Sequence, residues 1–130
     1  MPSVRSIMTS DVRTVHPESS AREALQLLVD HHISGLAVVD ADNKIVGVLS
    51  EKDLLAVFSS TERNIKVSSL MTPKPVMCSV DASLVDVFDC LMSHDFRRVL
   101  IHEKKKLVGL ISRSDLMPVV LEVLLDRVDD

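Results

Sequence analysis

The hydrophobic pattern alternates between the period of a strand and that of a helix, and it predicts a strand, a helix, a hairpin and a second helix. A short strand is predicted around residues 13–15. An apolar stripe at helical spacing follows and comprises Ala21, Ala24, Leu25 and Leu28. Apolar runs at 36–39 and 44–49, separated by the polar turn 40–43, predict a β-hairpin. Residues 50–53 then begin a second helix.

The same order of elements recurs because the sequence is duplicated. The segment 4–9, Val-Arg-Ser-Ile-Met-Thr, returns at 67–72 as Val-Ser-Ser-Leu-Met-Thr, an offset of 63. After a one-residue deletion an offset of 62 relates Gly47 to Gly109, Ser50 to Ser112 and Asp53 to Asp115. Two repeats, residues 1–60 and 61–130, therefore cover the chain.

Serine residues mark the predicted helix starts. Either Ser19 or Ser20 can be the first N-cap, and Glu23 lies three residues after Ser20, as in a capping box. Ser83 is the equivalent residue of the second repeat. Each repeat thus has the order β-α-β-β-α and is marginal in stability alone. We expect an α/β fold in which the two repeats pack sheet to sheet with pseudo-two-fold symmetry, joined by the polar segment 59–66.

This ordered set of motifs resembles a known family. The order V-x-x-(I/L)-M-T, a helix, and an apolar hairpin ending G-h-(I/L)-S-x-x-D-L is found twice over about residues 4–118, and it resembles the CBS domain, named after cystathionine β-synthase. A tandem pair is called a Bateman module. The resemblance implies a regulatory fold that binds adenosine-containing ligands in clefts between the repeats. Many family members have Pro where this chain has Ala37 and Leu100.

The junction between the second hairpin strand and the next helix carries candidate chemistry. Ser50 and Ser112 stand at predicted helix starts, where free backbone N–H groups favour an anion and a hydroxyl can donate to phosphate. Asp53 and Asp115 lie three residues later and can accept from ribose hydroxyls. The resemblance implies these same roles. The alternative is that Ser-x-x-Asp only caps the helix.

The resemblance places an apolar base pocket in each repeat, facing the Ser and Asp of the other repeat. The pocket segments are Thr14 and Val15 with residues 33–36, and Met77 and Cys78 with residues 96–99. Site one would combine Thr14, Ile33 and Leu36 with Ser112 and Asp115. Site two would combine Met77, Phe96 and Val99 with Ser50 and Asp53.

The two predicted sites differ in charge. Arg97 and Arg98 stand where the first repeat has Ser34 and Gly35. The resemblance matches Arg98 to a position that often carries a phosphate-binding Arg, whose planar fork donates two hydrogen bonds. Lys52 can add to site two and Arg113 to site one. Site two is therefore expected to bind phosphorylated ligands better. The alternative is that Arg97 and Arg98 are solvated charges at a strand edge.

Composition narrows the class of protein. The chain is 46% hydrophobic and 26% charged, as folded globular proteins are. A net charge of −4 argues against a nucleic-acid partner. No apolar run reaches the roughly 20 residues of a membrane helix, and residues 1–9 lack the apolar region of a signal peptide. We expect a cytoplasmic protein without a membrane partner.

The cysteines and histidines suggest no further chemistry. Cys78 and Cys90 do not form a CxxC motif, and no disulfide is expected in a reducing compartment. Their repeat equivalents are Val15 and Leu27, which favours core positions. The histidines lack metal-ligand spacing, so we expect no metal, and no cofactor besides a regulatory adenine nucleotide.

Two functional hypotheses remain. The first is a regulatory module that senses AMP, ADP, ATP or S-adenosylmethionine and signals to an unidentified regulated protein. The second is an interaction scaffold whose nucleotide clefts are vestigial. No pair of nucleophile and general base is apparent, so an enzyme is not expected. Residues 116–128 are apolar on more than one face if helical, and residues 54–58 are similarly rich, which predicts a homodimer. The alternative is that the last helix folds back on its own chain.

Overall fold

The computed structural model describes residues 1–94 and 97–128, which divide into two compact units. Unit 1 comprises Met1–Asp11, Val76–Lys104 and Val108–Asp130. Unit 2 comprises Val12–Pro75 and Lys105–Leu107. Each unit is a sheet covered by helices, so the predicted α/β class is confirmed. No helix within the described ranges is long and apolar enough to span a membrane.

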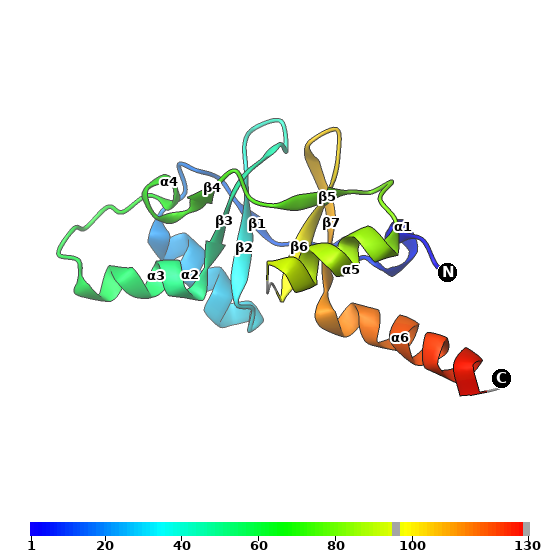
Figure 1. The fold of residues 1–130 in the computed structure, drawn as a ribbon. Helices are drawn as coiled ribbons and strands as arrows, with labels where there is room; N and C mark the ends of the chain where they lie inside the picture. The colour runs from blue at the N-terminus through cyan, green and yellow to red at the C-terminus, as the bar shows by residue number, and fades with distance from the viewer. Residues whose placement is uncertain (95–96, 129–130) are drawn as a thin grey trace. The chain divides into compact units, whose positions relative to one another are not determined.

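Unit 2 is built on a four-stranded sheet in the order β1-β2-β3-β4 (Figure 1). The strands are β1 (Thr14–Val15), β2 (Gly35–Val39), β3 (Ile45–Ser50) and β4 (Thr72–Pro73). The helices are α2 (Ala21–His31), α3 (Glu51–Leu55), the 3-10 helix η1 (Ala56–Ser59) and α4 (Val67–Leu70). β1 runs parallel to β2, whereas β2 and β3 form the predicted antiparallel hairpin. The helix expected after β3 is thus a short α-helix that continues as a 3-10 turn.

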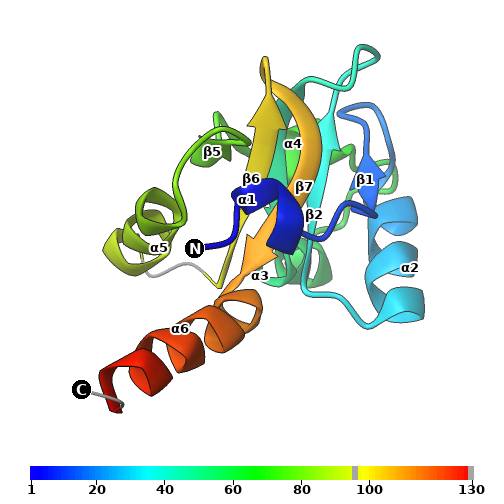
Figure 2. The same ribbon diagram turned by 90° about the vertical axis from the view of Figure 1, so that its right-hand side faces the viewer.

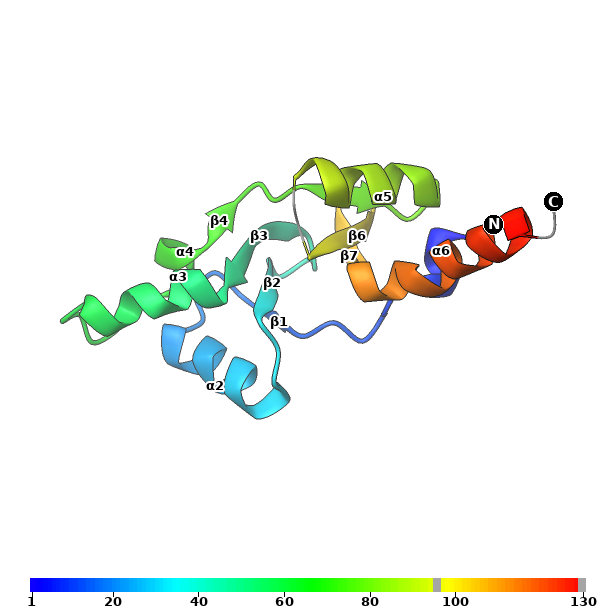
Figure 3. The ribbon, with the colours of Figure 1, turned by 60° about the horizontal axis from the view of Figure 1, so that its bottom comes forward.

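Unit 1 repeats this arrangement on a three-stranded sheet in the order β5-β6-β7. Its strands are β5 (Met77–Ser79), β6 (Arg98–Glu103) and β7 (Lys106–Ser112), although the first residues of β7 group with unit 2. Its helices are α1 (Val4–Ile7), α5 (Leu84–Ser93) and α6 (Arg113–Val128). Figure 3 shows α6 running away from the sheet of this unit.

The first segment of each sequence repeat packs in the unit formed mainly by the other repeat. Val4, from the start of repeat 1, is buried in the core of unit 1 with Val87 and Ile101. Thr9 exchanges two 2.9 Å backbone hydrogen bonds with Leu110, and Figure 2 shows α1 beside β7. Val67, from repeat 2, is buried in the core of unit 2 in the same way. The structural units therefore do not coincide with the sequence repeats.

A tight contact explains why the Met-Thr motif accompanies the hairpin glycine. A Cβ added at Gly109 would lie 2.6 Å from Met8 Sδ and 2.9 Å from the Thr9 carbonyl oxygen. At Gly47 the corresponding distances are 2.7 Å to Met71 Sδ and 2.9 Å to the Thr72 carbonyl oxygen. Only a residue without a side chain allows the preceding segment to approach the strand this closely.

Replacing Gly109 by Ala is expected to lower the free energy of unfolding by about 2 kcal/mol, because the added methyl group overpacks against Met8 and backbone. Gly35→Ala is the matched control. Its Cβ would meet its nearest neighbour, the Leu49 carbonyl oxygen, at 3.2 Å, so its effect should stay within about 1 kcal/mol. Urea unfolding followed by far-ultraviolet circular dichroism measures both. Equal stability of the two variants would contradict the packing argument.

The predicted caps begin the longer helices of both units. Ser20, rather than Ser19, is the N-cap of α2 and accepts from the Glu23 backbone N–H. Ser83 caps α5 by accepting from the Asp86 backbone N–H. Buried apolar residues then follow at helical spacing in both helices, so one face of each helix packs on its sheet.

Candidate functional site

Both predicted Ser–Asp pairs form reciprocal helix caps. The Ser50 N–H donates to Asp53 Oδ2 at 2.9 Å, and the Asp53 N–H donates to Ser50 Oγ at 3.2 Å. The equivalent distances for Ser112 and Asp115 are 2.8 and 3.3 Å. The capping alternative is therefore correct as a description of these four residues. It leaves the Ser hydroxyl hydrogen and the Asp Oδ1 outside the cap, so the predicted ligand roles stay open.

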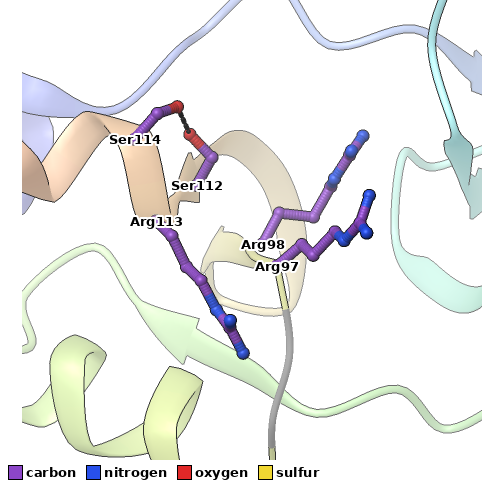
Figure 4. Close-up of a pocket in the computed structure, with 5 residues that line it drawn as sticks. All are labelled: Arg97, Arg98, Ser112, Arg113 and Ser114. Atoms are coloured by element: carbon purple, nitrogen blue, oxygen red, sulfur yellow. Dashed lines mark hydrogen bonds between the residues drawn. The ribbon is translucent and has the colours of Figure 1, made fainter.

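A pocket of about 330 Å³ opens at the start of α6 in unit 1. It is lined by Arg97, Arg98, Ser112, Arg113 and Ser114 (Figure 4). The Arg113 backbone N–H donates to the Arg97 carbonyl oxygen at 2.9 Å, which ties the helix start to the strand start. The hydroxyl groups of Ser112 and Ser114 are 2.8 Å apart. The structure thus brings together three arginines and two serines that lie at the start of β6, at the end of β7 and at the start of α6.

The charge of this pocket suits an anion. In Figure 4 the Arg97 and Arg98 side chains extend toward the same side of the view, and Arg113 extends in another direction. The positive charges around one pocket repel each other, and a bound anion offsets this repulsion. Guanidinium groups form short, paired hydrogen bonds with phosphate oxygens. The start of the 16-residue α6 adds the positive end of a helix dipole.

The equivalent positions in unit 2 have a different charge. The Glu51 backbone N–H donates to the Ser34 carbonyl oxygen at 3.0 Å, so the backbone link is the same. The side chains equivalent to Arg97, Arg98 and Arg113 are those of Ser34, Gly35 and Glu51. Lys52 occupies the position equivalent to Ser114. It is exposed, and it is the one cation among the unit 2 residues that correspond to the pocket lining. The arginine cluster is therefore a property of unit 1. Because the pocket combines Arg98 with Ser112 and Arg113 rather than with Ser50 and Asp53, the expected difference between the two predicted sites stays a prediction.

The predicted base-pocket residues differ in burial. Val15, Leu36 and Val99 are buried members of the hydrophobic cores of their units. The half-buried ones are Thr14, Ile33, Gly35, Met77 and Cys78. Phe96 lies outside the described residues. Each predicted site draws residues from both units, and this combination stays a prediction.

One pocket residue was not anticipated from the sequence. Ser114 lies between Arg113 and Asp115 at a position that the Ser-x-x-Asp motif leaves unspecified. The only available signal was its place in the first turn of a helix that begins at a candidate anion site. Groups of three or more His, Cys, Asp or Glu side chains able to hold a metal are absent from the described ranges 1–94 and 97–128.

Burial, together with smaller effects of the neighbouring Cys90 and Asp86, raises the pKa of the Cys78 thiol to about 12. Both cysteines are free thiols packed against the core of unit 1. The Cys78 thiol is therefore protonated at neutral pH. Because the folded state holds this proton more tightly than the unfolded chain, the contribution of Cys78 to stability falls as pH rises from about 9 toward 12.

Cys78 is expected to react with iodoacetamide about a hundredfold more slowly in the folded protein than in urea at pH 8, because the thiolate is the reacting form. Mass spectrometry of peptides from timed reactions measures the rate at this one residue. The urea-unfolded chain is the internal control. Equal rates in the two states would contradict the protected environment.

The comparisons with known proteins agree with this fold. The family model of the CBS domain matches residues 4–60 and again residues 67–122, so the chain belongs to the CBS domain family and contains two copies. The CBS domain-containing protein YhcV of Bacillus subtilis is 30% identical and aligns with 89% of this chain and 84% of its own length.

Two solved structures of related proteins contain nucleotides. The crystal structure of CBSX2 in complex with AMP is 32% identical, with a TM-score of 0.82, and the match covers 95% of this chain and 98% of that one. The cytosolic domain of the Mg²⁺ channel MgtE in complex with ATP is 26% identical, with a TM-score of 0.76. That match covers 86% of this chain and 46% of the other. Two proteins similar to this chain thus form complexes with adenine nucleotides.

Proposed function

We propose that this protein is a ligand-sensing module that binds an adenine nucleotide and transmits the bound state to a partner protein. The observation that carries the proposal is the pocket of unit 1, which three arginines and two serines line at the start of α6. Such a group of hydrogen-bond donors recognises an anionic phosphate group. The function requires no catalytic step.

The nucleotide complexes of CBSX2 and MgtE support the adenosine part of the proposal. The phosphate part is supported by the chain's own residues, because the arginines, the serine hydroxyls and the helix start are all donors or positive ends. The ribose role of Asp53 and Asp115 is proposed on the geometry of their caps, which employs one carboxylate oxygen of each residue and leaves the other for a ligand.

Calorimetric titration with AMP, ADP, ATP, S-adenosylmethionine and adenosine tests the proposal. AMP has about 23 heavy atoms, and about 0.3 kcal/mol per atom predicts a Kd on the order of 10 µM. We expect heat and a raised melting temperature with at least one phosphorylated ligand. Absence of both at about 1 mM for every ligand would overturn the sensing function and favour the scaffold with vestigial clefts.

The protein is also proposed to act as a homodimer. The outward side of α6 carries large apolar side chains that the rest of the described chain leaves exposed. Exposed apolar patches of this kind mark interaction surfaces, and a second copy of the chain supplies the same surface. The cytoplasmic location and the regulated protein stay predictions. Cell fractionation and crosslinking are the respective measurements.

A further inference from the structure

We propose that Arg97 and Arg113 make the unit 1 pocket selective for ligands that carry a chain of two or more phosphoryl groups. The inference rests on the proposed nucleotide function and adds a preference within it. A single phosphate is satisfied by one guanidinium fork, such as that of Arg98, together with a helix start. The pocket holds two further guanidinium groups beyond that requirement.

The positions of the three arginines favour an extended anion. Arg97 and Arg98 are neighbours at the start of β6, whereas Arg113 begins α6 and extends in a different direction in Figure 4. The 2.9 Å hydrogen bond from the Arg113 N–H to the Arg97 carbonyl oxygen fixes the two backbones together. A pocket of about 330 Å³ has room for more than one phosphoryl group. Arginine side chains that extend in different directions from one pocket can contact different phosphoryl groups of one chain.

Charge matching also excludes one class of ligand. Three guanidinium groups bring three positive charges to the pocket lining, with two neutral serines beside them. Each phosphoryl group added to a nucleotide brings another negative charge, so the attraction increases from AMP to ATP. The sulfonium centre of S-adenosylmethionine is positive and is repelled. Arg98 and Arg113 also interact with other groups of the protein, but a guanidinium has about five N–H donors and can serve a ligand as well.

The test compares AMP, ADP, ATP and inorganic tripolyphosphate by calorimetry on the full chain at low and moderate salt. For the wild-type protein we expect ATP to bind at least about tenfold more tightly than AMP, and tripolyphosphate to compete with ATP. Arg97→Gln and Arg113→Gln should each weaken ATP binding about three- to tenfold while changing AMP binding less than twofold. Arg127→Gln is the matched control. It removes the same charge at the other end of α6, about 20 Å away, and should change neither affinity.

The outcomes separate this inference from the proposed function. Equal affinity of the wild-type protein for AMP and ATP would overturn the selectivity and leave nucleotide sensing intact. The same holds if the Arg97 and Arg113 variants lose affinity for AMP and for ATP to the same extent. Binding of tripolyphosphate without any adenine nucleotide would support the phosphate-chain pocket and overturn the adenosine function. If tripolyphosphate does not compete with ATP, the phosphate chain of ATP binds outside this pocket and the inference is overturned.

Discussion

Replacing Arg98 by Gln is expected to weaken AMP binding at least about tenfold and to leave adenosine binding unchanged. Arg98 is the half-buried arginine of the pocket, where a charge-assisted hydrogen bond is least screened by water. Glutamine keeps much of the stem of the side chain but has no charge and no guanidinium fork. Calorimetry with AMP and with adenosine, which differ only in the phosphate, isolates that contact.

Two control variants sharpen this prediction. Arg127→Gln removes a charge outside the pocket and should have no effect on either ligand. Asp115→Ala should weaken AMP less than Arg98→Gln does, because it removes the proposed ribose contact but leaves the three arginines that line the pocket. It will also cost about 1 kcal/mol of stability through the lost cap. A parallel loss of adenosine and AMP in the Arg98 variant would show that the substitution disturbs the fold instead of a phosphate contact.

The local elements could be predicted from the sequence because short-range patterns determine them. The stripe beginning at Ala21 predicted α2, and the Ser-x-x-Asp spacing predicted the caps of Ser50 and Ser112, since each depends on residues within one or two turns. The internal repeat extended the same reasoning to the second half of the chain. The arginine pocket was partly predicted, because Arg97 and Arg98 depart visibly from Ser34 and Gly35 in the equivalent positions.

The long-range packing could not be predicted in this way. No periodic pattern in residues 4–9 indicates that Val4 is buried with Val87, or that Met8 lies over Gly109. These contacts join segments 83 and 101 residues apart, and only the three-dimensional arrangement brings them together. The grouping of Arg98 with Ser112 and Arg113 in one pocket was missed for the same reason, because the sequence argument had assigned them to different sites.

The wild-type protein is expected to have twice the mass of the 14.4 kDa chain at micromolar concentration, because α6 has two apolar faces. Leu116 is buried against the core of unit 1. Met117, Leu121 and Leu124 recur at helical spacing on another face, and each is at least 50% exposed. A single chain leaves that face in water at a cost of about 25 cal/mol for each Å² of apolar surface, which a second copy removes.

Leu124→Glu should release the monomer without loss of helix or sheet, because an unpaired carboxylate in an apolar interface is strongly unfavourable. We expect a rise of at least about a hundredfold in the dimer dissociation constant. Val76→Glu, a similar change at an exposed aliphatic residue outside α6, should leave the mass unchanged. The chain has no Trp or Tyr, so light scattering must be combined with refractive index rather than absorbance at about 280 nm. A wild-type mass near 14.4 kDa would refute the dimer. It would leave the exposed face of α6 for the regulated protein.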